Sequence, residues 1–566
     1  MVDLVVSNVL IADVISQQTY HGWFSIKGGR FFEVEAGDIP ADLAATQHVD
    51  AKGKTARPGL IDSHMHIESS LVTPARFAEA VLPWGTTTIL QDPHEVANVL
   101  GAEGIRWMIQ ASQNIRLRVY SSISSCVPAT AEHIETPNAQ LSSEDVLTLA
   151  NEPDVLALGE MMDYQGVIEG DTERLAILDA GRRASLSLEG HVPSLTGRDL
   201  SRYIAQGIRS NHTLMTPDRL REQVRKGLYV MLQEKSLTAD VVEAVMNLPD
   251  RSRVILITDD VMPDRLRRGH MSRILELAIS LGWEPLDALA SATLRPASYL
   301  GLRHLGALVP GYHADFFLSD EDVFPPKQVY VACECVAEQG HLNVTLADTP
   351  KRPDLTTTSF VHTELNEDFF RLSDASHVQA NIINVNTTNT FTTLEQRNIT
   401  LQDGVPQDDD LVMGVVVARQ TLQQAALPAR GAVTLVTGLG LTKGAYASTF
   451  GHDSHNLFVL GKSPKAMSQA AAAVLERGGG MAVVPAVDAS PLVLPLPYAG
   501  LLSDDAIEVV GEQFEALEQT LRQLGVSVKN PILLLTILPL TVSPEYKISD
   551  KGLVDVEKRQ VIASSS

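Results

Sequence analysis

Between residues 58 and 260, short apolar runs alternate with longer stretches in which apolar residues recur at helical spacing. The short runs have the length and composition of buried β-strands. There are eight of them, at 58–66, 86–94, 116–124, 155–160, 185–192, 208–213, 228–233 and 253–260. Eight successive strand–helix units predict an α/β fold with a (β/α)8 barrel of the TIM type. An open doubly wound sheet is the alternative, but no glycine-rich dinucleotide loop follows the first run.

Short strands are expected on both sides of this region. Residues 24–34 read as a hairpin that turns at Gly28 and Gly29, and a similar strand-rich pattern returns at 306–331. We therefore expect these flanking segments to form one small composite β-domain.

A third domain is expected after about residue 352, where Asp- and Thr-rich stretches mark a boundary. A buried strand at 411–417 and an Ala-rich helix at 464–477, which three glycines terminate, predict a C-terminal α/β (α+β) domain. The predicted domains are 1–57 and 302–351 for the composite β-domain, 58–301 for the barrel, and 352–566 for the C-terminal domain.

Charge and cysteine content restrict the partners and the compartment. The 566-residue chain has a formal net charge of −24 and no Lys- or Arg-rich block, which argues against a nucleic-acid partner. Its three cysteines are too few for a disulfide framework and favour a reducing cytoplasm. The first residues lack the basic region of a signal peptide, and nothing in them suggests export. The apolar run 531–542 is too short to cross a bilayer, so we expect a buried strand there and no membrane partner.

Metal-type ligands recur where the predicted strands end. The active site of such a barrel lies at the C-terminal ends of its strands. The candidates at those ends are His64, His66, Glu160, His191, His212 and Asp259. Each histidine taken alone is more often a core or surface residue than a ligand. Together they match the imidazole and carboxylate ligands of Zn, Fe and Mn sites, and they exceed what one tetrahedral ion needs.

Two ions are therefore plausible at this rim. Glu160 is placed to bridge them, and a water held by both would lose a proton near neutral pH. Asp259 is a candidate both for metal binding and for shuttling that proton.

Several motifs resemble known families. Residues 58–66 resemble the opening motif of the amidohydrolase superfamily, and residues 308–315 resemble the return of that superfamily to its small β-domain. Further segments resemble the adenine deaminase family: 66–70, 92–99, 124–129, 159–164, 190–193 and 451–456. The resemblance spans residues 58 to 456, and the general layout of the bacterial family covers nearly the whole chain.

The resemblance implies hydrolysis of adenine to hypoxanthine and ammonia in purine salvage, at a dinuclear site of Mn or Fe, with Zn as the alternative metal. It assigns ligand roles to His64, His66, Glu160, His191, His212 and Asp259. Glu160 stands where most dinuclear members use a carboxylated lysine, as in adenine deaminases. Thr213 departs from the acidic residue that often follows the ligand His212. A homodimer is expected from the family alone.

Four residues are the candidates for catalysis. Asp259 is expected to transfer protons, and Glu160 either bridges metals or carries a proton. His94 and Glu95 are weaker candidates for stabilising charge or contacting the base edge, with a structural turn as the alternative. His452 and His455 either approach the metal rim or form a hydrogen-bonded turn; the sequence leaves both open.

Two other functions remain as alternatives. One is a cyclic-amide hydrolase of the same superfamily, acting on a dihydropyrimidine or a hydantoin, although Glu160 in place of lysine argues against it. The other is a non-catalytic scaffold, which would be expected to have lost some of the six ligand candidates.

Overall fold

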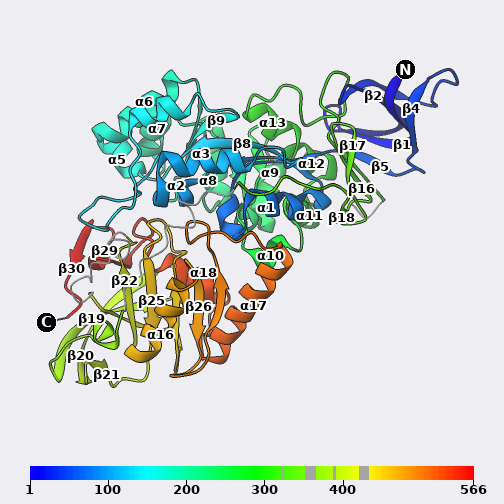
Figure 1. The fold of residues 1–566 in the computed structure, drawn as a ribbon. Coiled ribbons are helices and arrows are strands. Elements are labelled where there is room, and N and C mark those ends of the chain that lie inside the picture. The colour runs from blue at the N-terminus through cyan, green and yellow to red at the C-terminus, as the bar shows by residue number, and fades with distance from the viewer. Residues whose placement is uncertain (321–323, 351–364, 387–390, 420–431, 566) are drawn as a thin grey trace. The chain divides into compact units, whose positions relative to one another are not determined.

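The computed structural model describes the whole chain except residues 321–323, 351–364, 387–390, 420–431 and 566 (Figure 1). The chain divides into two compact units. Unit 1 consists of Met1–Pro93, Arg106–Ser125 and Ser142–Thr349, and unit 2 of His94–Ile105, Cys126–Leu141 and Pro350–Ser566. The predicted boundary at residues 351/352 lies outside the described residues.

A nine-stranded sheet in unit 1 combines the N-terminal segment with residues after 315. Its order is β18-β17-β16-β15-β5-β1-β2-β3, and β4 also pairs with β1. The strands are β1 (Val2–Asp13), β2 (Gln18–Lys27), β3 (Arg30–Ala36), β4 (Ala45–Asp50), β5 (Thr55–Pro58), β15 (Phe316–Ser319), β16 (Gln328–Val331), β17 (Glu334–Glu338) and β18 (His341–Leu342). The predicted hairpin is present, because Lys27 pairs with Arg30 and both Gly28 and Gly29 have positive φ. Such a two-residue turn suits glycine, which carries no Cβ.

Parallel strands form the second part of unit 1. A six-stranded sheet has the order β10-β9-β8-β7-β6-β14, and a three-stranded sheet has the order β11-β12-β13. The strands are β6 (Leu60–His66), β7 (Thr86–Gln91), β8 (Arg118–Ile123), β9 (Val155–Met161), β10 (Ser187–Gly190), β11 (Ser210–Asn211), β12 (Tyr229–Leu232), β13 (Val254–Leu256) and β14 (Asp259–Asp260). The predicted mixed α/β class is confirmed, and the parallel strands β6–β10 and β14 form a half-barrel sheet.

The two parallel sheets are linked at two places. The amide of Arg209 donates to the carbonyl of Leu188 at 2.9 Å, between β10 and β11. The predicted strand 253–260 is divided, so that β13 pairs with β12 while β14 pairs with β6. Residues 253–260 therefore pair with both sheets, β13 with one and β14 with the other.

Helices follow most of these strands. They are η1 (Ile67–Ser70), α1 (Pro74–Val81), η2 (Leu82–Trp84), α3 (Ala102–Ala111, whose first residues belong to unit 2), α4 (Ser143–Leu149), α5 (Tyr164–Glu169), α6 (Thr172–Arg183), α7 (Gly197–Ala205), α8 (Pro217–Arg225), η3 (Glu234–Ser236), α9 (Ala239–Met246), α10 (Pro263–Leu266), α11 (Met271–Ser280), α12 (Pro285–Ser291) and α13 (Leu294–Tyr299). In α6 the side chain of Asp171 accepts from the amides of Glu173 and Arg174, and Ile177 and Leu178 are buried. A capped, amphipathic helix of this kind is what the sequence pattern predicts.

Unit 2 contains a second nine-stranded sheet, in the order β21-β20-β19-β23-β22-β25-β24-β26-β27. Its elements are α2 (His94–Leu100), η4 (Glu367–Phe370), β19 (His377–Val385), β20 (Thr392–Gln402), β21 (Val405–Pro406), β22 (Val412–Val417), β23 (Thr434–Thr437), β24 (Ala445–Ser448), β25 (Leu457–Gly461), α16 (Pro464–Leu475), β26 (Gly480–Val484), β27 (Leu492–Pro495), α17 (Ile507–Gln523), α18 (Pro531–Ile537), β28 (Tyr546–Ser549), β29 (Gly552–Asp555) and β30 (Gln560–Ile562). The predicted Ala-rich helix is α16, which Ser463 caps and which packs on β24, β25 and β26 (Figure 1).

The strand predicted at 531–542 is wrong. Pro531–Ile537 forms the helix α18, with Pro531 in its first turn. Proline suits the first turn of a helix, where its missing N–H has no partner to lose, and leucine is a good helix former. Among the described helices, none combines the length and apolar character needed to cross a membrane.

Candidate metal centre

Strand β6 directs two histidines to the same side. His64 and His66 are separated by one residue, and successive side chains of a strand alternate between faces. Both imidazoles are buried, with residue exposures of 1% and 2%. The pair is therefore available to a common ligand.

The other four predicted ligands come from neighbouring strand ends in unit 1. Glu160 lies in β9, His191 follows β10, His212 follows β11, and Asp259 opens β14. Their side chains converge on those of β6. His66 Nε2 lies 3.5 Å from Glu160 Oε1 and 3.4 Å from Asp259 Oδ1. The structure thus brings all six predicted ligands into one cluster.

Glu160 is shared between two groups of ligand atoms. Its Oε2 lies 2.5 Å from His191 Nδ1 and 3.1 Å from His212 Nε2. The group of His64, His66 and Glu160 and the group of Glu160, His191 and His212 each bring their ligand atoms within 4.8 Å of one another. Burial raises the pKa of Glu160, but the charges of His212 and His191 outweigh burial and hold it well below its usual value. Glu160 is therefore an ionised carboxylate between the two groups.

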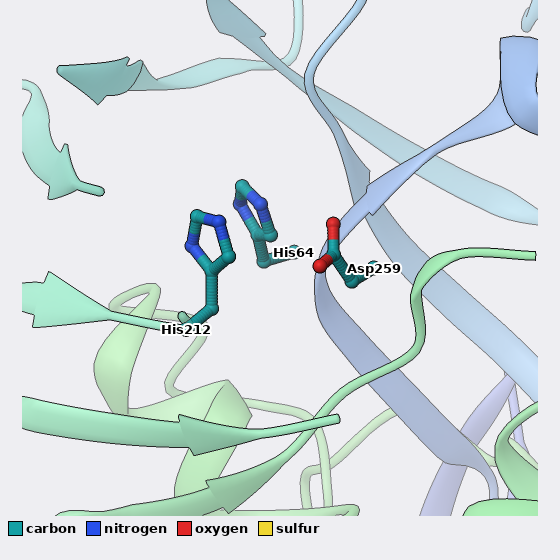
Figure 2. Close-up of side chains that lie close together, drawn as sticks. All are labelled: His64, His212 and Asp259. Carbon is teal, nitrogen blue, oxygen red and sulfur yellow. The ribbon is translucent and has the colours of Figure 1, made fainter. Parts of the chain in front are cut away.

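His212 is stacked on His64, and Asp259 lies beside the two rings (Figure 2). The ring centroids are 4.0 Å apart and the ring planes differ by 20°. Burial and the charge of His64 lower the pKa of His212. Burial would also lower the pKa of His64, but the charge and hydrogen bond of Glu189 raise it to about 9. Two stacked imidazoles cannot both be cationic at low cost, so one ring remains available as a neutral ligand.

Each histidine of β6 is oriented through its Nδ1 atom. His64 Nδ1 donates to Glu189 Oε2 at 2.9 Å, and His66 Nδ1 donates to the carbonyl of Asp92 at 2.9 Å. Both rings therefore direct Nε2 toward the cluster. Metal-bound histidines commonly have such a partner on their other nitrogen.

Two imidazole nitrogens in the cluster are buried and have no hydrogen-bond partner within the described parts of the chain. They are His64 Nε2 and His212 Nδ1. A buried polar atom without a partner is costly, so such atoms in a native structure point to a missing ligand. Imidazole and carboxylate donors are those of Mn, Fe and Zn sites. The residues present therefore fit a divalent metal centre.

Three supporting residues were not assigned a role from the sequence. Asp92 accepts from the Glu160 amide at 3.1 Å and from Ser124 Oγ at 3.2 Å. Gln233 donates its amide to Asp259 Oδ2 at 2.6 Å and to the His212 carbonyl at 3.1 Å. Glu189 has a sequence signal, because it precedes His191 by two residues, whereas nothing in the sequence marks Gln233.

Thr213, the residue that departs from the family pattern, lies in a hydrogen-bonded corner. Its hydroxyl donates to the carbonyl of Val192 at 2.8 Å and accepts from Asn211 Nδ2 at 3.1 Å. Arg219 donates to the same carbonyl at 2.5 Å. Thr213 therefore ties the segment after β10 to the segment after β11.

The other two predicted catalytic residues, His94 and Glu95, belong to unit 2 and begin α2. Glu95 Oε1 lies 2.5 Å from His452 Nδ1, and Glu95 Oε2 accepts from His455 Nε2. His94 Nε2 lies 3.6 Å from Glu95. Burial raises the pKa of Glu95, but the charges of His452 and His455 hold it well below its usual value.

His455 is fixed on both sides of its ring. Its Nδ1 accepts from the amide of Gly451 at 3.2 Å, so the proton resides on Nε2 and points to Glu95. Burial lowers the pKa of His455 to about 4, although the charge of Glu95 acts to raise it. Arg419 is fully buried and donates to the His455 carbonyl at 2.9 Å and to the Ala499 carbonyl at 2.8 Å. The structure thus shows a hydrogen-bonded turn at 451–456.

Comparison with known proteins covers both parts of the chain. A model of the amidohydrolase family matches residues 55–380, and a model of the adenine deaminase C-terminal domain matches residues 389–560. The chain is 36% identical to an adenine deaminase of Desulfatibacillum aliphaticivorans, over 98% of this chain and 95% of the relative. It is 35% identical to an adenine deaminase of Halalkalibacterium halodurans, over 98% and 94% of the two chains. A third relative, an adenine deaminase of Oleidesulfovibrio alaskensis, is 38% identical over 99% and 96%. The chain therefore belongs to the adenine deaminase family within the amidohydrolase superfamily.

Proposed function

We propose that this enzyme hydrolyses adenine to hypoxanthine and ammonia in purine salvage. The observation that carries the proposal is the similarity to curated adenine deaminases over 98% of the chain. It covers both the residues of the six-ligand cluster and the C-terminal region that matches the adenine deaminase model. The cyclic-amide alternative and the scaffold alternative are not favoured by relatives of this kind.

The proposed cofactors are two divalent metal ions, Mn or Fe, with Zn as the alternative. His64, His66, Glu160, His191, His212 and Asp259 would hold them. Bound cations of this type supply Lewis acidity and lower the pKa of a coordinated water. The sharing of Glu160 between two groups of ligand atoms supports its role as the bridge.

Asp259 is the proposed proton carrier. Burial raises the pKa of its carboxyl, but a hydrogen bond from His66 and the charges of the histidines lower it below the usual value. An ionised carboxylate can take one proton from the attacking water. The water oxygen bonds to C6, one proton ends on N1, and the other leaves on the departing amine as the C6–N6 bond breaks. Gln233 holds Asp259 in place for these transfers.

His94 and Glu95 are proposed to act less directly. Each carboxylate oxygen of Glu95 lies against an imidazole, which supports a positioning role instead of direct contact with the base. The same contacts support a structural role for His455. For His94 we keep the proposal that it stabilises charge or contacts the base.

We further propose that the two parallel sheets are parts of one (β/α)8 barrel. The backbone link between β10 and β11 and the pairing of β14 with β6 support closure. We retain the domains 1–57 with 302–351, 58–301 and 352–566 as proposals, and also a cytoplasmic homodimer that binds no nucleic acid or membrane.

The test is ammonia release from adenine by protein stripped of metal and then titrated with Mn²⁺. Dihydroorotate and hydantoin are assayed in parallel. Turnover of adenine that returns with about two equivalents of Mn²⁺ supports the dinuclear deaminase. Glu160→Gln and Asp259→Asn are then expected to lose activity, by about 100-fold or more for the proton carrier.

The outcomes separate the candidates. If adenine is inert while a cyclic amide is opened, the substrate assignment is wrong and the superfamily assignment stands. Full turnover without added metal, in protein shown to contain none, would contradict the proposed cofactors.

A further inference from the structure

We propose that Glu189 is a positioning residue of the metal centre, which fixes His64 in the tautomer and orientation that present Nε2 to a cation, and that Tyr299 fixes Glu189 in turn. The inference rests on the proposed function only in assuming that His64 binds metal. It assigns a role to Glu189, a buried charged residue of β10 that supports the six candidate ligands without being one of them.

A chain of hydrogen bonds carries the proposal. His64 Nδ1 lies 2.9 Å from Glu189 Oε2, and Glu189 Oε1 accepts from the Tyr299 hydroxyl at 3.0 Å. The Tyr299 oxygen lies 3.1 Å from Ser210 Oγ. Each oxygen of the carboxylate therefore has its own donor, and one of these donors is the ring that faces the cluster.

Because Glu189 is buried, its carboxylate depends on the contact with His64. Its residue exposure is 1%, and it lies in β10 within the parallel sheet. A buried carboxylate is retained at low cost only when a counter-charge and hydrogen bonds satisfy it. Across the part of the chain that the structure describes, His64 is the one ion-pairing partner of Glu189. The positive charge that balances Glu189 therefore lies on the His64 ring, as a proton, or on a cation that this ring binds.

Tyr299 holds the Glu189 carboxylate through a hydrogen bond to Oε1. It ends α13 and belongs to an apolar cluster formed with Leu90, Ala157, Met231, Ile255 and Ile257. Its ring also packs on Tyr229, with the centroids 4.8 Å apart. The hydroxyl is therefore held by packing, and its hydrogen bond fixes one rotamer of Glu189.

His64 and His66 differ in the hydrogen-bond acceptor of their Nδ1 atoms. Glu189 is a charged acceptor for His64, whereas His66 donates to the neutral carbonyl of Asp92. A carboxylate behind a histidine raises the basicity of its other nitrogen and fixes the ring. Stacking on His212 at 4.0 Å restricts the His64 ring further. Of the two histidines of β6, His64 is thus the one whose affinity for a cation depends more on a second residue.

The experiment measures Mn²⁺ binding to metal-free protein by equilibrium dialysis and elemental analysis, without any substrate. The variants are Glu189→Gln, which keeps an acceptor but removes the charge, Glu189→Leu, which removes both, and Tyr299→Phe. The matched control is Glu135→Gln, because Glu135 is also a buried carboxylate, 2% exposed, but accepts from two threonine hydroxyls in unit 2.

We expect Mn²⁺ affinity to fall about 10- to 100-fold in Glu189→Gln, further in Glu189→Leu and less in Tyr299→Phe. The control is expected to bind as the wild type does. Thermal unfolding of the metal-free proteins is measured in parallel, and Glu189→Gln is expected to melt below the wild type because it removes one partner of the buried His64–Glu189 pair.

Mn²⁺ affinity within threefold of wild type in both Glu189→Gln and Tyr299→Phe would overturn the proposal. So would an equal loss of affinity in the control Glu135→Gln, because a purely structural role would not distinguish the two buried carboxylates. Both variants preserve side-chain size, so the test does not depend on Glu189→Leu folding. Failure of adenine turnover would count against the proposed function and leave this measurement unaffected.

Discussion

Among single residues, Gln233 controls the position of Asp259. Its amide donates to Asp259 Oδ2 at 2.6 Å and also to the His212 carbonyl. A hydrogen bond to a charged group contributes about 1.5–3 kcal/mol. We therefore expect Gln233→Leu to lower kcat/KM for adenine by about 10- to 100-fold. The melting temperature of the metal-free protein serves as the control, and kcat/KM within twofold of wild type would contradict the assigned role.

Glu135 makes the stability of the chain depend on pH. Burial raises the pKa of its carboxyl from 4.5 to about 7, and the charge of Asp453 adds to this, against the hydrogen bond from Thr130. Between these two values the folded chain keeps a proton that the unfolded chain releases. The contribution of this group to the free energy of unfolding therefore falls as the pH rises from about 4.5 to about 7.

The variant Glu135→Gln cannot titrate at this position. Its melting temperature minus that of the wild type is expected to increase from pH 5 to pH 8, because the wild type alone loses stability over that range. The measurement is a melting series of both proteins in the same buffers. A difference that stays constant with pH would show that Glu135 keeps its ordinary pKa.

The sequence indicates single residues only where they follow a pattern. The six candidate ligands each follow a strand-like run, so their convergence could be predicted from the rule that such sites lie at strand ends. Tyr299 could not be predicted, because it ends a helix that is 110 residues from Glu189 in the chain. Its role depends on a rotamer and a distance, which no local pattern specifies.

At the scale of elements, Gly159 allows β9 to approach Asp92 closely. A methyl group at this position would lie 2.2 Å from Asp92 Oδ2, the atom that accepts from the Glu160 amide. Gly159→Ala would therefore displace Asp92, whose carbonyl also orients His66. We expect Mn²⁺ affinity to fall about tenfold or more, measured by equilibrium dialysis.

The matched control is Gly282→Ala. Gly282 has a φ of +101° and nothing within 4 Å of an added methyl group. This substitution is expected to cost about 1–2 kcal/mol of stability through backbone strain but to leave Mn²⁺ affinity unchanged. Equal effects of the two substitutions on affinity would contradict the specific role of Gly159.

Elements were predictable where length and flanking residues agreed. The helix α16 has a serine cap, a proline at its first position and a glycine stop, and it lies where the sequence predicts it. Residues 531–537 are a short leucine-rich run, which periodicity alone cannot assign to strand or helix. The division of the last parallel strand into β13 and β14 also lacks a local signal, because it depends on which strand each half pairs with.

For the whole molecule, the sequence could indicate the order of the domains but not the membership of every segment. Cys126–Leu141 belongs to unit 2, although it lies between two strands of the parallel sheet. Its contacts explain this: Thr136 donates its amide to Asp550 at 2.8 Å, and Ser549 Oγ donates to the Ile134 carbonyl at 2.6 Å. These partners are more than 400 residues apart in the chain. Only the folded structure reveals them.

The division into two units predicts how metal affects unfolding. All six candidate ligands lie in unit 1, and none of them lies in unit 2. A ligand that binds only folded unit 1 stabilises it by about 2.7 kcal/mol at a free concentration of 100 times its dissociation constant. In calorimetric scans of the metal-free protein, Mn²⁺ is therefore expected to raise the transition of unit 1 alone.

The two transitions can be assigned with variants that the structure supplies. His64→Ala is expected to abolish the response to Mn²⁺, whereas Glu135→Gln, in unit 2, is expected to shift the other transition at pH 8 and to leave the response intact. If Mn²⁺ raises both transitions equally, the units unfold together and the stability of unit 2 depends on the metal centre. If Mn²⁺ raises only the transition that Glu135→Gln shifts, the six residues of unit 1 are not the metal ligands.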